Sequence, residues 1–168
     1  MSEPQFDAAD AKQFRQVLGH FPTGVTIVTG MAGDRPTGFT IGSFTSVSLD
    51  PPLVGFLPQV DSDTWDAMAS GGKFCVNVLR DGQADLCWRF AKSDLHDARF
   101  DETTWSMSPN GCPVLEGVGA WIDCDVERVE TFGDHYFVLG RVVDLFHTSE
   151  PHAPLVFWRG ALGGFASD

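Results

Sequence analysis

Basic residues are scarce in this chain of 168 residues. Eleven Lys and Arg stand against 23 Asp and Glu, which gives a formal net charge of −12 at pH 7. A protein that neutralises the phosphates of a nucleic acid carries charge of the opposite sign. The composition therefore argues against nucleic acid as a partner.

Long apolar runs are also missing. No stretch approaches the roughly 20 apolar residues that span a bilayer, and residues 1–15 lack the basic start and apolar core of a secretion signal. We therefore expect no membrane segment and a cytoplasmic protein. A hydrophobic content of 43% with 20% charged residues predicts one folded domain over residues 1–168, in which residues 1–20 form a helical lead-in.

Metal-binding and nucleotide-binding motifs are absent as well. The four cysteines form no CxxC pair and no cluster with histidine at zinc spacing, so we expect reduced, buried thiols and no metal site; they are Cys75, Cys87, Cys112 and Cys124. The sequence has no GxGxxG, GxxxxGK[ST], HExxH or GxSxG. A bound nucleotide would have to be held by residues outside these known motifs.

The sequence does contain a strong β-strand pattern. A short amphipathic helix is predicted from Asp7, which can cap its start, to Gly19, and further helices over 62–70 and 82–91. β-Branched or alternating segments predict strands over 25–29, 37–48, 53–57, 74–79, 117–129, 135–146 and 155–158. With no β-α-β alternation and no repeat, these strands predict an antiparallel, closed or partly closed barrel, whose sheet is completed by residues 155–158.

Hydroxyl groups are concentrated in the segment Thr37–Ser48. Thr40, Ser43, Thr45, Ser46 and Ser48 could bind the polar edge of a ring, or a phosphate, where basic residues are few. Ser and Thr are equally ordinary on the exposed face of a sheet. The residues by themselves leave both interpretations open.

A series of segments resembles the short-chain flavin reductase family. The matching segments, in the family's order, are Pro22–Thr29, Gly38–Thr40, Ser43–Leu53, Phe74–Leu79, Gln83–Phe90, Arg99–Phe100, Gly111–Leu115, Gly133–His135 and Pro154–Phe157. The resemblance implies an antiparallel, Greek-key, FMN-binding split β-barrel with a few short helices, usually a homodimer. It also implies hydride transfer from NADH or NADPH to FMN or FAD, often to supply a partner monooxygenase. No motif decides between the two flavins or the two nicotinamides.

The resemblance also implies a site. The flavin ring and ribityl chain would lie against Thr40, Ile41, Gly42, Ser43, Ser46, Val47 and Ser48, with Asn77 and Phe100 nearby. Ser62 and Thr64 would bind the phosphate, although Asp61 and Asp63 beside them would repel it. The nicotinamide would lie at Gly133, Asp134 and His135; in isolation, His135 could equally be a structural turn residue. No catalytic residue is expected, because hydride transfer depends mainly on positioning.

Two other functions remain compatible with the sequence. A flavin-binding barrel could carry or sense flavin without oxidising a nicotinamide. A flavoprotein could also reduce a different acceptor, such as a corrinoid or a metal centre. The sequence does not separate these from a flavin reductase.

Overall fold

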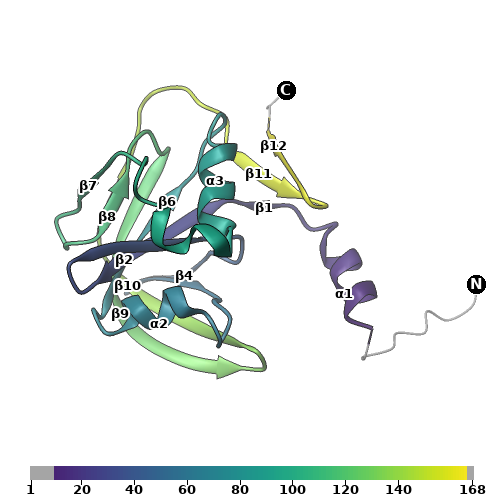
Figure 1. Ribbon diagram of the computed structural model, residues 1–168, viewed down its shortest axis with the longest axis horizontal. Coiled ribbons are helices and arrows are strands. Elements are labelled where there is room, and N and C mark those ends of the chain that lie inside the picture. The colour runs from purple at the N-terminus through teal and green to yellow at the C-terminus, as the bar shows by residue number, and fades with distance from the viewer. Residues whose placement is uncertain (1–9, 166–168) are drawn as a thin grey trace, which may run out of the picture.

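A computed structural model describes residues 10–165 and has a curled antiparallel sheet at its centre (Figure 1). Its seven strands are β2 Thr26–Ala32, β3 Arg35–Ile41, β4 Thr45–Leu49, β5 Pro52–Phe56, β6 Lys73–Val78, β9 Ala120–Phe132 and β10 His135–His147. They are ordered β3-β2-β6-β9-β10-β5-β4, and every neighbouring pair is antiparallel. The predicted antiparallel β architecture is confirmed.

Two smaller sheets flank the main one. β1 Thr23–Gly24, β11 Leu155–Trp158 and β12 Ala161–Gly164 form one, in the order β1-β11-β12, and β7 Trp105–Met107 pairs with β8 Pro113–Leu115. The prediction that residues 155–158 complete the main sheet is therefore wrong. Arg159 and Gly160, both with positive φ, turn the chain back on itself, so that β11 pairs with β12 and β1 instead.

Three short α-helices and one 3₁₀ helix complete the fold: α1 Ala11–Leu18, α2 Asp63–Ala69, α3 Ala84–Ala91 and η1 Ser93–Ala98. Asp10 caps α1, since its side chain accepts hydrogen bonds from the amides of Lys12 and Gln13. The predicted cap, Asp7, lies outside the described residues. The helices predicted over 62–70 and 82–91 are confirmed as α2 and α3. Among residues 10–165, no helix is long and apolar enough to cross a membrane.

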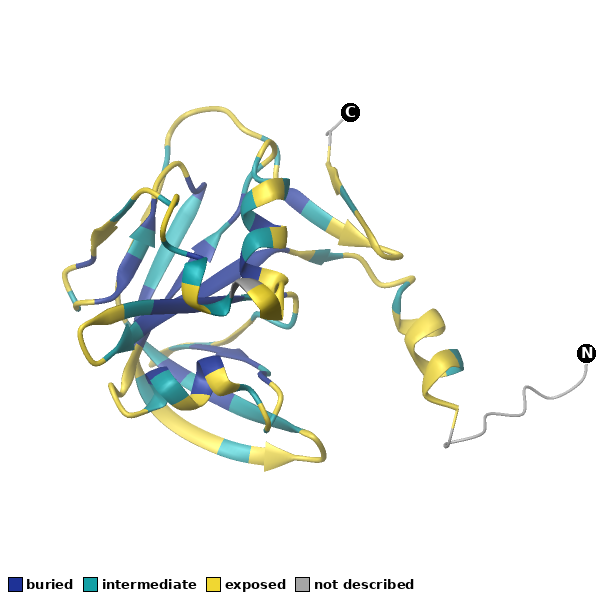
Figure 2. Ribbon diagram, viewed as in Figure 1, coloured by how far each residue is buried: buried dark blue, intermediate teal, exposed yellow. Residues whose placement is uncertain are grey.

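Strands β2 and β6 are buried on both faces over most of their length. Successive side chains of a strand point to opposite faces. Ile27 accordingly packs with Leu79 and Phe90 in one core cluster, whereas its neighbour Val28 packs with Phe74 in the other. Figure 2 shows this buried interior, and it shows α1 exposed along its length.

A buried polar layer attaches β8 to the sheet. The Asn77 amide nitrogen donates to the Ile27 carbonyl at 3.2 Å and to Thr29 Oγ1 at 3.0 Å, while its Oδ1 accepts from the Leu115 amide at 2.8 Å. Thr29 Oγ1 also donates to the Pro113 carbonyl at 2.5 Å. Since buried polar groups are costly when unpaired, this network fixes the irregular segment before β9 on the sheet.

The segment 37–48 forms two strands, whereas the sequence predicts one. β3 ends at Ile41 and β4 begins at Thr45. Ser43 Oγ accepts a hydrogen bond from the Leu57 amide at 3.0 Å, which redirects the chain between the two strands. The residues after Ser43 therefore pair with β5 rather than continuing beside β2.

The four cysteines are free and buried, as expected. Burial raises the pKa of all four thiols, and it raises those of Cys112 and Cys124 to about 12. A thiol with so high a pKa is a poor nucleophile at neutral pH. Within residues 10–165, no group of three or more His, Cys, Asp or Glu side chains could hold a metal ion.

Candidate active site

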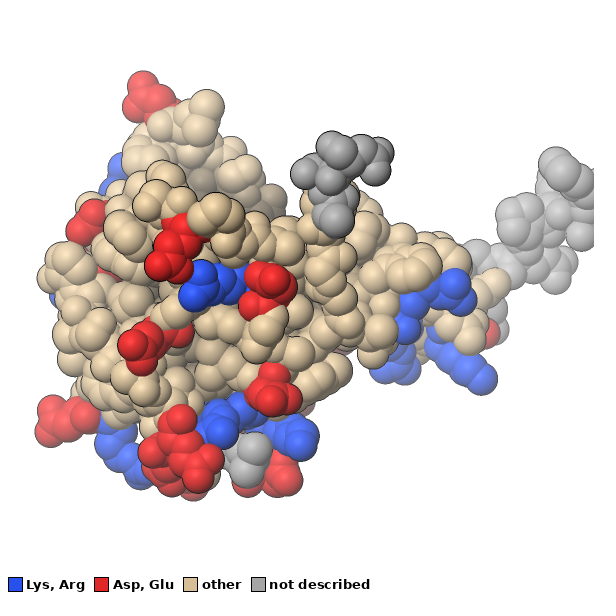
Figure 3. All heavy atoms as spheres, turned by 90° about the horizontal axis from the view of Figure 1, so that it is seen from above, with Lys and Arg blue, Asp and Glu red and all other residues tan. Residues whose placement is uncertain are grey.

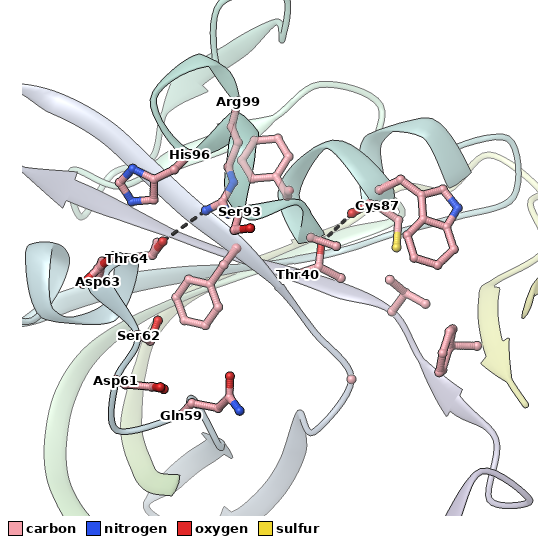
Figure 4. Close-up of a pocket in the computed structure, with 17 residues that line it drawn as sticks. Thr40, Gln59, Asp61, Ser62, Asp63, Thr64, Cys87, Ser93, His96 and Arg99 are labelled. Carbon is pink, nitrogen blue, oxygen red and sulfur yellow. Dashed lines mark hydrogen bonds between the residues drawn. The ribbon is translucent and has the colours of Figure 1, made fainter. Parts of the chain in front are cut away.

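A cleft of about 530 Å³ lies between β3, the chain that leads into α2, and the helices α3 and η1 (Figure 4). Its walls combine apolar and polar side chains from distant parts of the sequence: Val25, Phe39, Thr40, Gly42, Gln59, Asp61, Ser62, Asp63, Thr64, Cys87, Trp88, Phe90, Ala91, Ser93, His96, Arg99 and Phe157. Clefts of this size and mixed lining are typical of sites for small molecules and cofactors.

A second compartment of about 330 Å³ adjoins the first. The two share Phe39, Thr40, Gly42, Gln59 and Ser62, and the second adds Ile41, Ser43, Leu57, Pro58 and His135. Because these residues line both, the two compartments lie side by side. The segment Thr40–Ser43 therefore lies between the polar end formed by η1 and the end marked by His135.

The end of β3 forms the shared wall. Thr40 Oγ1 donates to the Cys87 carbonyl at 2.7 Å, which joins the strand to α3. Gly42 has no side chain, and a Cβ there would come within 3.2 Å of Thr23 Oγ1. This hydroxyl is buried and has no hydrogen-bond partner among the described residues.

Arg99 is the principal cation of the cleft, although it is only 6% exposed. Its Nη1 donates to the Gly38 carbonyl at 2.8 Å and to Thr64 Oγ1 at 3.1 Å, and its Nη2 donates to the Lys92 carbonyl at 2.9 Å. None of these partners is a carboxylate, and the buried Nε has no partner among residues 10–165. Burial lowers the pKa of Arg99, so an anion in the cleft would compensate for the lost hydration.

Asp61 and Asp63 line the same end of the cleft, as their positions in the sequence predict. The hydroxyls beside them already have partners within the protein. Ser62 Oγ caps α2 by accepting from the Trp65 amide at 3.2 Å, and Thr64 accepts from Arg99. A phosphate at this end would therefore depend on the cationic side chains more than on the start of α2.

His135 lies at the start of β10, and it lines the second compartment. Its Nδ1 is 2.7 Å from Asp134 Oδ1, and this hydrogen bond lowers the pKa of Asp134. Gln59 and His135 also form an isolated antiparallel bridge. The hydrogen bond to Asp134 orients the imidazole, and the bridge places the start of β10 beside Gln59.

Seven of the residues predicted for the site line the cleft: Thr40, Ile41, Gly42, Ser43, Ser62, Thr64 and His135. The others lie elsewhere in this chain. Ser46, Val47 and Ser48 are on the edge strand β4, Gly133 and Asp134 form the exposed β9–β10 turn, Asn77 is fully buried, and Phe100 packs edge-on against Phe90 and Trp105.

Sequence reasoning missed Arg99 and His96. Arg99 stands in the Arg-Phe pair of the family resemblance, but only its neighbour Phe100 was predicted for the site. His96 belongs to the irregular segment 92–116, in which no periodicity indicates the direction of a side chain. The three-residue spacing of Ser93, His96 and Arg99 is the one signal that could have revealed them, because such residues share one face of a 3₁₀ helix.

The model of the flavin reductase like domain matches residues 18–166 of this chain. A flavin reductase of Pseudomonas putida is 51% identical over 161 residues, which cover 95% of this chain and 93% of the relative. The reductase subunit HsaB of a flavin-dependent monooxygenase from Rhodococcus jostii (strain RHA1) is 44% identical over 162 residues, which cover 96% of this chain and 82% of the relative.

Solved structures agree with the sequence relatives. A nitrilotriacetate monooxygenase component B homologue from Mycobacterium thermoresistibile superposes with a TM-score of 0.90 at 41% identity, over 94% of this chain and 87% of that one. The NADH:FAD oxidoreductase SgcE6 of Streptomyces globisporus, in complex with NAD and FAD fragments, gives a TM-score of 0.90 at 35% identity over 98% of both chains.

This chain belongs to the flavin reductase family. It is an oxidoreductase with the split-barrel fold, as the sequence resemblance implies. The predictions of family, fold and flavin reductase activity are confirmed.

Proposed function

We propose that this chain binds FMN or FAD in the cleft beside Thr40–Ser43 and reduces it with hydride from NADH or NADPH bound near His135. The reduced flavin would then serve a partner monooxygenase. The protein's contribution is to hold two ring systems in contact and to limit the access of water between them.

Arg99 is the observation that carries this proposal. A buried guanidinium without a carboxylate partner favours an anionic ligand, and a flavin nucleotide brings a phosphate. The apolar wall at Phe39, beside the polar groups of Thr40 and the open backbone at Gly42, suits a flat heteroaromatic ring with polar edges. The lining of the cleft thus fits both parts of a flavin nucleotide.

The names of relatives support the same assignment. SgcE6 is a NADH:FAD oxidoreductase, and SmoA of Agrobacterium fabrum, 36% identical over 157 residues, is an FMN reductase that uses NADH. HsaB is the reductase subunit of a monooxygenase. We infer from these relatives that this chain also supplies a monooxygenase.

The purified protein is expected to oxidise NADH or NADPH only when FMN or FAD is present, because no other redox group is visible in its sequence. Loss of nicotinamide absorbance under anaerobic conditions measures the turnover. Flavin binding without turnover of either nicotinamide would favour a carrier or sensor. Absence of flavin binding would contradict the proposed site.

Replacing His135 with Ala is expected to lower kcat/KM for the nicotinamide by about 5- to 100-fold, the usual effect of one positioned hydrogen bond. Flavin affinity and melting temperature should stay near those of the unchanged protein. Steady-state kinetics at saturating flavin, with calorimetry of unfolding, measure both. Early unfolding with unchanged nicotinamide kinetics per folded site would show that His135 is a structural turn residue.

We also propose that the protein is a homodimer. Apolar side chains on and after α1 are widely exposed, among them Val17 at 65% and Phe21 at 74%. Figure 1 shows α1 extending away from the barrel. Lys12 and Arg15 are part of α1, and Figure 3 shows basic side chains on this extension, whereas most of the acidic side chains are on the barrel. A second acidic barrel would cover the apolar side chains and attract the basic ones.

Light scattering should accordingly give a mass of twice the 18.3 kDa of one chain. The double variant Val17→Glu, Leu18→Glu is expected to be monomeric, since it places charges in the apolar surface. Met107→Glu, an equally exposed position on β7 away from α1, is the control. A monomeric mass for the unchanged protein at micromolar concentration would contradict the proposal.

A further inference from the structure

We propose that His96, protonated and oriented by Asp97, is a second binding group for the flavin phosphate, so that FAD binds with the uptake of a proton. The inference rests on the proposed function, which places flavin in the cleft. It assigns a role to a side chain for which neither the sequence pattern nor the family resemblance gave one.

His96 shares a face of η1 with the cation already described. A 3₁₀ helix has three residues per turn, so Ser93 and His96 lie on one side of η1, and Arg99, the residue that follows the helix with helical φ and ψ, continues that side. All three line the main cleft, opposite the segment that leads into α2 (Figure 4). A hydroxyl, an imidazole and a guanidinium are thus presented together to whatever occupies this end.

The hydrogen bonds of His96 define its chemistry. Its Nδ1 lies 3.3 Å from Asp97 Oδ1, an arrangement in which Nδ1 carries a proton and donates it to the carboxylate. The other ring nitrogen, Nε2, is buried and has no partner among the described residues. In the neutral ring Nε2 is a lone-pair acceptor, which a phosphate oxygen cannot satisfy. After protonation it becomes a charged donor, which a phosphate oxygen can accept.

The charges around this end of the cleft oppose an anion as long as His96 is neutral. Asp61 and Asp63 face this end of the cleft from the start of α2, Asp97 contacts the ring, and Arg99 is the one arginine or lysine in the lining. Lys92 and Asp94 lie beside η1 but outside the lining of the main cleft. Three carboxylates against one guanidinium repel a phosphate, and an imidazolium would reduce that excess of negative charge.

Proton uptake can be measured directly by calorimetric titration of FAD at pH 7.5 in buffers of different ionisation enthalpy. FAD is suitable because its pyrophosphate keeps its charge between pH 6 and 8, whereas the FMN phosphate titrates at a pKa of about 6. We expect the unchanged protein to take up protons on binding FAD and to lose about tenfold in affinity between pH 6 and pH 8. Riboflavin, which lacks phosphate, should show neither effect.

His96→Gln should abolish the uptake, flatten the pH profile, and weaken FAD binding at pH 6 by about tenfold with riboflavin binding unchanged. His96→Lys, which keeps a permanent cation, should bind FAD without taking up a proton. His135→Gln tests the other histidine of the cleft, and His147→Gln tests an exposed histidine outside it; both should retain the uptake.

Unchanged uptake and an unchanged pH profile in His96→Gln would overturn the inference, as would equal losses of FAD and riboflavin affinity. Loss of proton uptake in His135→Gln, with uptake retained in His96→Gln, would also overturn it. If the unchanged protein bound no flavin at all, the proposed function itself would fail, so the two failures are distinguishable.

Discussion

Arg99→Gln is expected to weaken FAD binding by about 10- to 150-fold, because hydrogen bonds to charged groups contribute about 1.5–3 kcal/mol. The guanidinium is the principal permanent cation of the cleft and is nearly buried, so solvent screens its interaction with a phosphate very little. Riboflavin affinity should change less than threefold, since that molecule has no phosphate. Fluorescence titration with the two flavins measures the difference.

The same variant tests how Arg99 joins separate elements. Gln cannot reach all the carbonyls that Arg99 contacts, so we also expect a loss of about 1–3 kcal/mol in the free energy of unfolding. Arg89→Gln removes a half-buried arginine of α3 that pairs with Glu102 and does not line the main cleft, and it should change neither property appreciably. Equal losses of FAD and riboflavin affinity in Arg99→Gln would contradict a phosphate contact.

Asn77→Ala is expected to lower the free energy of unfolding by about 3–5 kcal/mol, the sum of unsatisfied buried groups and a small cavity. Asn77 is fully buried. Its truncation removes the side-chain amide group that hydrogen-bonds to the backbone N–H of Leu115 and to the backbone carbonyl of Ile27. Both groups lie between β8 and the sheet, where water cannot replace the lost side chain. Urea denaturation measures the change.

Flavin affinity per folded molecule should be unchanged in Asn77→Ala, since the residue does not line the cleft. Asn110→Ala is the control, because its amide makes hydrogen bonds at a partly buried position and should lose about 1 kcal/mol or less. A stable Asn77→Ala protein with weakened flavin binding would restore Asn77 to the site, where the family resemblance places it.

Much of the fold is local in origin, and the sequence predicts it correctly. The β-branched run after Val25, the turn at Gly33 and the turn at Gly133 specify hairpins through the preferences of neighbouring residues. The helix α2 likewise follows from its Ser62 cap, and α3 follows from the spacing of its apolar residues. These features need no information from distant parts of the chain.

The errors of the sequence analysis arise where distant segments meet. Ser43 ends β3 by binding the backbone at Leu57, a contact between residues fourteen positions apart. β11 pairs with β1, more than 130 residues earlier, rather than with the main sheet. Asn77 is polar and lies in a matching segment, but its partners occupy two other segments, β2 and β8, that enclose it in the core.

By itself, the sequence determined the family, the antiparallel β architecture and the stretch Thr40–Ser43 that lines the cleft. Each of these depends on consecutive residues or on short motifs in a fixed order. The tertiary structure alone decided which polar residues are core and which face a ligand. Arg99 and His96 reach the cleft because η1 presents every third residue to it, and Asp61 and Asp63 face them from another element. The burial and the charge of the polar end of the cleft depend on side chains that are 30 or more positions apart in the sequence. No local sequence pattern predicts that these side chains meet.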